Sequence, residues 1–246
     1  MVGLTYETYK TQIAEMAVVA PTDENYLAIL PSMIEYATNR INRDLDLMAT
    51  SVSLYGAGYK LISGNRNLSF NQNLADGSYF VVSEQINLIS PAGNTDPELS
   101  ERIPLLPTTK EFLDAVYGSS LSQNRGEPRY FVPFNDTLFL VGPVPDQDYY
   151  VEVVGTVRPA PLSETVTSTF ISQYLPDIFI MASMIYISAY QRNFGRQSDD
   201  PQMAQSYESQ YQALLKSAVV EEARKKFESA GWTSQSPAQV ATPTRG

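Results

Sequence analysis

The chain has 246 residues and contains neither cysteine nor histidine, which excludes Ser–His–Asp and Cys–His catalysis, disulfides, iron–sulfur clusters and histidine metal ligands. Hydrophobic residues make up 43% of it and charged residues 18%, a balance typical of a folded globule rather than a disordered chain. The 17 basic and 27 acidic residues give a formal net charge of −10, which argues against a general basic clamp for nucleic acid.

Two helices are expected at the N-terminus. Apolar residues at helical spacing predict the first over residues 5–18, with Thr5 as its N-cap. After a break at Ala20-Pro21-Thr22, Thr22 is the predicted cap of a second, amphipathic helix. Pro31 removes one backbone hydrogen bond from this helix and either kinks it or marks its true start. The apolar stripe of the second helix consists of Leu27, Leu30, Ile34, Ala37, Ile41, Leu45 and Met48.

Residues 50–162 favour β structure, because short β-prone stretches alternate there with glycine, asparagine and proline. Phe134–Leu138 is expected to form a hairpin tip between two apolar strands. The predicted strands are Val52–Tyr55, Tyr59–Ile62, Leu68–Phe70, Tyr79–Val82, Gln85–Ile89, Tyr130–Phe134, Leu138–Val141 and Tyr149–Val157.

One short helix interrupts this β-rich region. Either Thr108 or Thr109 is expected to cap it, and Gly118 is expected to end it. Its predicted apolar face consists of Phe112, Leu113 and Val116.

Two further helices are expected towards the C-terminus. The first begins near Pro176 and runs to Phe194, where Gly195 stops it, and its apolar residues cover nearly its whole circumference. Its most apolar part, Ile178–Tyr190, is shorter than the roughly 18 residues that a membrane span needs, so burial is expected and no membrane association. The second helix begins at Asp200-Pro201 and ends near Ala230. Its expected i,i+4 ion pairs are Glu221 with Lys225 and Glu222 with Lys226.

The remaining residues, 231–246, are small, polar and proline-containing, and no periodicity continues into them. A segment of this composition is expected to be a flexible arm when the chain is free. Trp232, at the root of the arm, is the only tryptophan in the sequence.

Together these elements predict an α+β protein, in which the N- and C-terminal helices form a helical bundle with an inserted β-rich module. The expected domains are residues 1–49 with 163–230 for the bundle, 50–162 for the module and 231–246 for the arm.

No stretch of the sequence predicts a catalytic, cofactor or metal site. Gly56–Lys60 lacks the spacing of a phosphate-binding loop and is expected to form a hairpin turn. Asp146 and Asp148 could share a cation if extended, but the surrounding prolines favour a turn with local hydrogen bonds. Asp44 is expected to pair with Arg40, one helical turn earlier. We therefore expect a protein that is not an enzyme and needs no cofactor.

Three blocks of sequence follow one another in a characteristic order. The first joins Leu4-Thr5-Tyr6 to Met33-Ile34-Glu35-Tyr36-Ala37-x-x-Arg40-Ile41-x-Arg43-Asp44-Leu45. The second is Leu138-Phe139-Leu140-x-Gly142-Pro143-Val144-Pro145-Asp146, followed by Tyr149-x-Val151-Glu152. The third is Arg158-Pro159-x-Pro161-Leu162-Ser163, followed by Tyr174-Leu175-Pro176-Asp177. From about residue 4 to residue 230 the chain thereby resembles the head-to-tail adaptor, or connector, proteins of short-tailed bacteriophages, the podovirus-type portal adaptor family.

The resemblance implies a structural role in the neck of a virion that is assembled in the host cytoplasm. It implies a homo-oligomeric ring of twelve subunits beneath the portal protein, joined below to the tail nozzle and the tail fibre proteins. Such a ring extends the channel through which double-stranded DNA passes without sequence-specific binding. An acidic wall suits this passage, because negative charge repels the phosphates of the duplex.

The resemblance also implies an arm that docks on the portal, and the arm residues expected to do so are Trp232, Pro237, Val240 and Arg245. Packing within the bundle or between subunits is expected of Ile34, Ile41, Leu45, Ile178, Met181 and Ile185. An alternative from another class is a carbohydrate- or receptor-binding tail component. It would use the β-rich module around Tyr130–Tyr150, because tyrosine rings stack on sugars.

Overall fold

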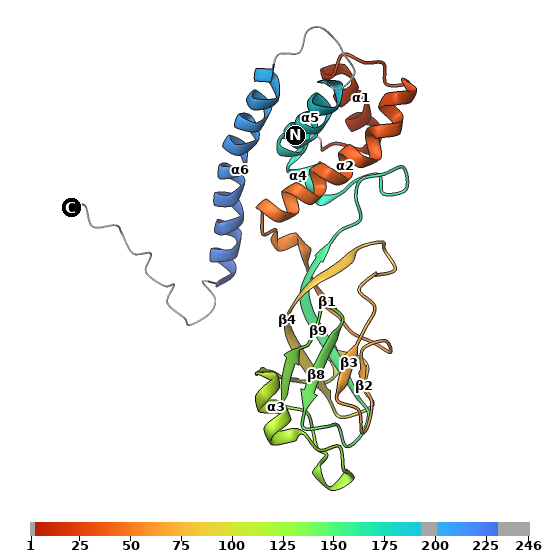
Figure 1. The fold of residues 1–246 in the computed structure, drawn as a ribbon, viewed down its shortest axis with the longest axis vertical. Coiled ribbons are helices and arrows are strands. Elements are labelled where there is room, and N and C mark those ends of the chain that lie inside the picture. The colour runs from red at the N-terminus through yellow and green to blue at the C-terminus, as the bar shows by residue number, and fades with distance from the viewer. Residues whose placement is uncertain (1–2, 193–200, 231–246) are drawn as a thin grey trace, which may run out of the picture. The chain divides into compact units, whose positions relative to one another are not determined.

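The computed structural model describes residues 3–192 and 201–230, which divide into two compact units. The helical unit takes in the residues up to Ala49 and those from Pro161 onward, and the β unit is Thr50–Ala160. Figure 1 shows the helices of the first unit and the strands of the second. The predicted α+β class is confirmed.

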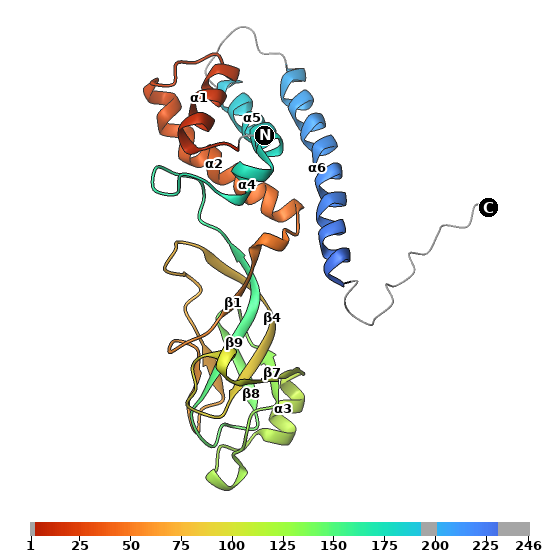
Figure 2. The ribbon, with the colours of Figure 1, turned by 180° about the vertical axis from the view of Figure 1, so that it is seen from behind.

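The helical unit contains α1 (Tyr6–Met16), α2 (Glu24–Asp44), α4 (Phe170–Tyr174), α5 (Pro176–Arg192) and α6 (Pro201–Ala230). Helix α5 packs against α1, α2 and α6, so it is the central element of the unit. In both Figure 1 and Figure 2, α1 and α6 lie on opposite sides of α5. Helix α4, which is not predicted from the sequence, is one short turn capped by Thr169.

Short polar side chains decide where the first two helices begin. Thr5 caps α1 as predicted, and its hydroxyl accepts from the Thr8 N–H while the Thr8 hydroxyl accepts from the Thr5 N–H at 2.8 Å. The predicted cap of α2 is wrong, because Asp23 rather than Thr22 accepts from the Tyr26 N–H, at 2.9 Å. A carboxylate at this position also meets the positive end of the helix dipole.

One apolar core holds the helical unit together. Helix α2 continues through Pro31 without ending. Of its predicted stripe, the two ends are exposed: Leu27 lies in the first turn of the helix, and Met48 lies beyond its last residue, Asp44. The middle of the stripe is at most 3% exposed and consists of Leu30, Ile34, Ala37, Ile41 and Leu45.

Helix α5 begins at Pro176, as predicted, and its side chains from Ile178 to Ser188 are buried or half-buried. The Ser183 hydroxyl donates to the Phe179 carbonyl at 2.7 Å and shares a 2.6 Å hydrogen bond with the Tyr9 hydroxyl, so its polar group is satisfied inside the core. The predicted end of this helix at Phe194 and Gly195 lies outside the described residues.

The β unit consists of two sheets. In the first, the strand order is β1 (Ser51–Leu54), β9 (Tyr149–Arg158), β4 (Tyr79–Ser90) and β5 (Glu101–Pro104), and β2 (Lys60–Leu61) also pairs with β9. In the second, the order is β3 (Asn67–Ser69), β8 (Leu138–Gly142), β7 (Tyr130–Pro133) and β6 (Leu106–Pro107). The pairing of β6 with β7 is parallel, and the other ladders are antiparallel. Short 3-10 turns lie at Met48–Thr50, Pro97–Leu99 and Ser122–Asn124.

A second apolar core joins the two sheets of the β unit. At its centre, the ring of Phe70 lies edge-on to Phe80 with centroids 5.3 Å apart and stacks on Phe139 at 5.9 Å. Since Phe80 belongs to β4 and Phe139 to β8, these contacts connect one sheet to the other.

The predicted strands are confirmed with three corrections. Strand β4 is one strand where two are predicted, and register shifts at Phe80/Val82 and Ser83/Gln85 mark the bulges that interrupt its pattern. Strands β5 and β6 are not predicted at all. The turn at Gly56–Lys60 is not a hairpin, because the strands on either side of it both pair with β9 rather than with each other.

The helix of the β unit is α3 (Lys110–Tyr117), and the structure resolves which threonine caps it. Thr109 accepts from the Phe112 N–H, and Gly118 is the C-cap as predicted. The predicted apolar face is only partly correct, since Leu113 is buried while Phe112 is 38% and Val116 55% exposed.

Candidate interaction surfaces

Helix α6 is held on the helical unit by charged and aromatic side chains around Arg40. The Arg40 Nη2 donates to Glu208 Oε1 at 2.6 Å, and its Nε lies 3.7 Å from Asp44 Oδ2, the pair predicted from the sequence. The guanidinium also covers the ring of Tyr211 at 4.3 Å, and the Tyr211 hydroxyl donates to Asp44 at 2.7 Å. Because Arg40 and Asp44 belong to α2 and the other two to α6, this Arg40 cluster joins the two helices.

The contacts of the Arg40 cluster favour the charged forms of Arg40 and Glu208. Burial opposes the charge of Arg40, but hydrogen bonds to Glu208 and Tyr36 outweigh burial and raise its pKa. The same hydrogen bond from Arg40 lowers the pKa of the Glu208 carboxyl. Both groups are therefore charged at neutral pH, and their ion pair connects α2 to α6.

A second group of ion pairs holds α6 near its C-terminal end. Glu222 is only 4% exposed and pairs with Lys225 at 2.6 Å, while Lys225 also reaches Glu221 at 3.3 Å, which confirms the predicted Glu221–Lys225 pair. The predicted pair of Glu222 with Lys226 is wrong, because Lys226 forms its ion pair with Asp46. Asp46 follows α2 in the sequence, and a tertiary contact therefore replaces the local one.

The apolar residues expected to pack within the bundle or between subunits lie together in the helical unit. Ile34, Ile41, Leu45 and Ile178 are at most 3% exposed, and Met181 and Ile185 pack against the same core while partly buried. The first four are covered by residues of their own chain. The expected arm residues Trp232, Pro237, Val240 and Arg245 lie outside the described residues.

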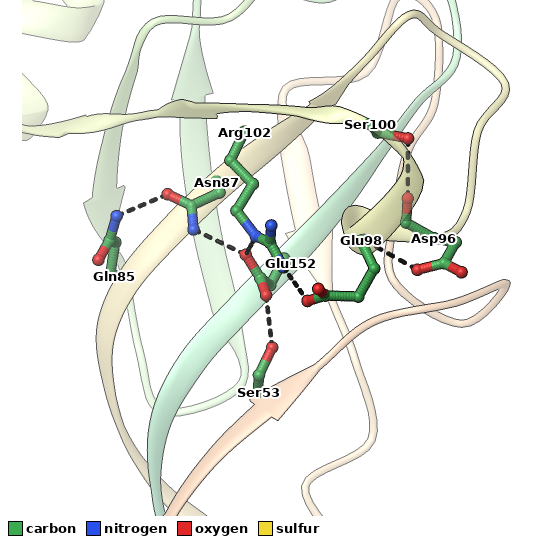
Figure 3. Close-up of polar contacts among 8 residues, drawn as sticks. All are labelled: Ser53, Gln85, Asn87, Asp96, Glu98, Ser100, Arg102 and Glu152. Carbon is green, nitrogen blue, oxygen red and sulfur yellow. Dashed lines mark hydrogen bonds and ion pairs between the residues drawn. The ribbon is translucent and has the colours of Figure 1, made fainter.

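In the β unit, one buried carboxylate holds four strands together. Figure 3 shows Glu152 of β9 at the centre of this Glu152 network. Its carboxylate accepts from the Ser53 hydroxyl at 2.6 Å, from Asn87 Nδ2 at 2.8 Å and from Arg102 Nε at 2.9 Å. Arg102 also pairs with Glu98 at 2.5 Å (Figure 3). The network thus links β1, β4, β5 and β9.

The Glu152 network stabilises the sheet and is not suited to proton transfer. Burial disfavours the charge of Glu152, but hydrogen bonds from Ser53, Asn87 and Arg102 outweigh burial and lower its pKa. A carboxylate with three donors is stable in its charged form and has little tendency to act as a base. The sequence signal for it is a lone acidic residue between two apolar residues, Val151 and Val153, that are both fully buried.

The aspartates weighed as cation ligands have local partners instead. Asp146 Oδ1 accepts from the Tyr149 hydroxyl at 2.8 Å, and Asp148 pairs with Lys60 at 2.7 Å and accepts from the Ser63 N–H. Within residues 3–192 and 201–230, the structure contains no cluster of three or more metal-ligating side chains. No helix in that same part of the chain combines the length and the apolar character that crossing a membrane requires.

Aromatic side chains form a partly exposed cluster between α3 and β7, in which Phe112 is exposed while Tyr117 and Tyr130 are half-buried. The ring of Tyr130 lies 5.4 Å from that of Phe112 and 5.9 Å from that of Tyr117. A hollow of about 490 Å³ elsewhere on α3 is lined in part by Arg66 and Asp114, which pair with each other at 2.7 Å. The rings of the aromatic cluster thus pack on one another and on α3, while the charged groups of the hollow already satisfy each other.

Comparison with known families identifies one match. A family model described as "SU10 adaptor protein" matches residues 5–240, which covers nearly all of the chain and residues of both units. No curated protein matches the sequence.

Proposed function

The chain belongs to the SU10 adaptor protein family of phage head-to-tail adaptors, and from this membership we propose that it forms a ring of twelve subunits beneath the portal. Its place is the virion, where an adaptor contacts other virion proteins. The family match over residues 5–240 is the observation that carries the proposal, because it includes both the helical and the β unit.

The proposed mechanism is assembly on a template. A free chain meets the portal ring in the host cytoplasm, and its arm, residues 231–246, docks on portal subunits. Neighbouring helical units then pack around the axis and close a symmetric ring. The geometry of the portal sets the number of subunits, and the ring performs no chemistry and needs no cofactor.

The ring extends the DNA channel and offers the tail nozzle and the tail fibres a platform. The net charge of −10 supports this role, since an acidic wall repels DNA phosphates and lets the duplex slide. Tail proteins would bind the β unit, where the aromatic cluster at Phe112, Tyr117 and Tyr130 is partly exposed.

Co-sedimentation of the purified chain with cognate portal rings tests the proposal. We expect the chain to pellet with the portal and to remain in the supernatant without it. A chain that stays in the supernatant in both cases contradicts the adaptor function.

The partly exposed aromatic cluster favours one alternative, a carbohydrate- or receptor-binding tail component, because aromatic rings stack on sugars. A glycan array probed with the full-length chain discriminates the two functions. Glycan binding that is lost in Tyr130→Ala, together with no portal binding, supports the alternative, whereas portal binding without glycan binding rejects it.

A further inference from the structure

The outer face of α6 carries a patch that no other part of the described chain covers. The residues that α6 buries are Tyr211, Ala218 and Glu222. At 100° per residue, Lys216, Val220 and Arg224 lie on the opposite side of the helix and Val219 lies on its flank, and we call these four residues the α6 outer face. Val219 is 47% and Val220 50% exposed.

The charges of the α6 outer face are basic and unpaired. Lys216 and Arg224 form no ion pair with any side chain that the structure describes, whereas Lys225, on the inner side, pairs with both Glu221 and Glu222. The α6 outer face thus carries two exposed valines and two basic side chains that form no ion pair in the described part of the chain.

A second unpartnered residue lies in the turn between α1 and α2. The α1 helix ends in a Schellman motif, with the Val18 N–H donating to the Glu15 carbonyl at 3.1 Å and the Val19 N–H to the Ala14 carbonyl at 3.0 Å. This motif places Val18 in the left-handed region, at φ 57°, where glycine is usual and a β-branched residue is strained. Val18 is also 79% exposed, so burial within its own chain does not compensate the strain.

Acidic side chains surround Val18 in the sequence. Glu15 precedes it, and Asp23 and Glu24 follow at the start of α2, all of them exposed. Asp23 caps α2 through the Tyr26 N–H, and none of the three forms an ion pair within the described part of the chain. The α1–α2 turn, residues 15–24, therefore carries an exposed valine among carboxylates that form no ion pair.

The two surfaces are complementary in charge but lie too far apart to meet within one chain. Helix α5 packs against both α1 and α6, and Figures 1 and 2 show those two helices on its opposite sides. Two complementary surfaces on opposite sides of one molecule produce a head-to-tail contact, which closes into a ring when the rotation allows it.

We propose that the α6 outer face of one copy of this chain docks on the α1–α2 turn of the next copy. Val18 packs against Val219 and Val220, while Lys216 and Arg224 face the carboxylates of the turn. Burial of Val18 in the partner accounts for a strained, exposed valine where glycine would suit the backbone. The contact deepens the proposed function and rests on it only for closure into a ring.

Cysteine cross-linking tests this contact cleanly, because the chain contains no cysteine of its own. Val18→Cys and Val220→Cys each replace an exposed side chain, so both variants are expected to fold. The two single variants are mixed under oxidising conditions, with and without portal rings. We expect at least about tenfold more disulfide-linked dimer in this mixture than when Val220→Cys is mixed with Asn94→Cys, an exposed control in the β unit. The double variant Val18→Cys/Val220→Cys is expected to give a ladder of oligomers.

The outcomes separate this contact from the proposed function. Cross-linking no stronger than the control, with and without portal, overturns the contact even if the wild-type chain binds the portal. If Val18→Cys alone gives more disulfide-linked dimer than the mixture does, the proposed contact is also overturned, because that result indicates a symmetric contact. Specific cross-linking in a chain that does not bind the portal supports the contact and contradicts the adaptor function.

Discussion

At the scale of single residues, Val18 shows how a strained position can serve an interface. A left-handed conformation disfavours a β-branched side chain by roughly 1–2 kcal/mol, and such strain persists where function selects for it. A glycine would end α1 equally well through the same two backbone hydrogen bonds. The proposed contact between copies of the chain therefore gives Val18 a role that the stability of the single chain does not.

Val18→Gly is expected to stabilise the chain and to weaken its assembly. Relief of the backbone strain should raise the free energy of unfolding by about 1 kcal/mol and Tm by about 2–4 °C. Loss of the apolar side chain should reduce ring formation. Calorimetry and mass measurements of the assembly check the two effects. Val18→Ala, which keeps a Cβ at the positive φ, is the matched control and should weaken assembly without the gain in Tm. A lower Tm for Val18→Gly than for the wild-type chain would contradict the claim that the backbone at Val18 is strained.

Glu152→Gln is expected to destabilise the β unit by about 2 kcal/mol, since the amide cannot accept from three donors as the carboxylate does. Because the pKa of Glu152 is lowered in the folded state, its contribution is present above the ordinary glutamate pKa and is lost as the pH falls through the folded value. Urea unfolding at neutral and acidic pH measures both effects, and the variant should show a weaker loss of stability in acid. Glu98→Gln, whose side chain is 73% exposed, should change little. Equal losses for the two variants would show that Glu152 is not the centre of the network.

At the scale of helices and strands, the docking of α6 depends on a few polar contacts, because its buried face is narrow. Tyr211→Phe keeps the ring beneath Arg40 and removes only the hydroxyl that donates to Asp44. We expect a loss of about 1 kcal/mol in the free energy of unfolding, measured by urea titration. Tyr174→Phe, on a side chain that is 72% exposed, is the control and should be neutral. A neutral Tyr211→Phe would mean that the hydrogen bond from Tyr211 to Asp44 does not help to hold α6.

Elements whose signals are local could be predicted from the sequence. The cap at Thr5, the start of α5 at Pro176 and the strand Tyr149–Arg158 each follow from a capping residue or a run of β-prone residues next to a turn. Strands β5 and β6 could not be predicted, since they are short, contain Pro104 and Pro107, and exist through pairing with distant strands.

The surfaces were harder to predict than the elements. The sequence identified Ile34, Ile41 and Ile178 as packing residues because helical periodicity shows a buried face. It gave no sign of Val18, because only the structure shows both its positive φ and its exposure. The partner of Lys226 was also missed, since Asp46 is close only after the chain has folded.

At the scale of the whole molecule, the family match identifies a phage adaptor, and in the proposed function its helical unit builds the ring. Under that proposal, removal of residues 231–246 is expected to leave a folded chain with lost portal binding, because this small, polar, proline-containing segment is the proposed docking arm. Circular dichroism and co-sedimentation with portal rings measure the two properties. Portal binding by residues 1–230 at wild-type strength would show that the arm is not the docking segment.

The most direct test of the account is mass photometry of the cognate portal ring, alone and mixed with the purified chain. The account predicts that the portal gains about twelve chains of 27.3 kDa, the number that a cyclic ring matched to the portal requires. A portal whose mass does not change, beside a chain that remains a monomer, would contradict the adaptor function.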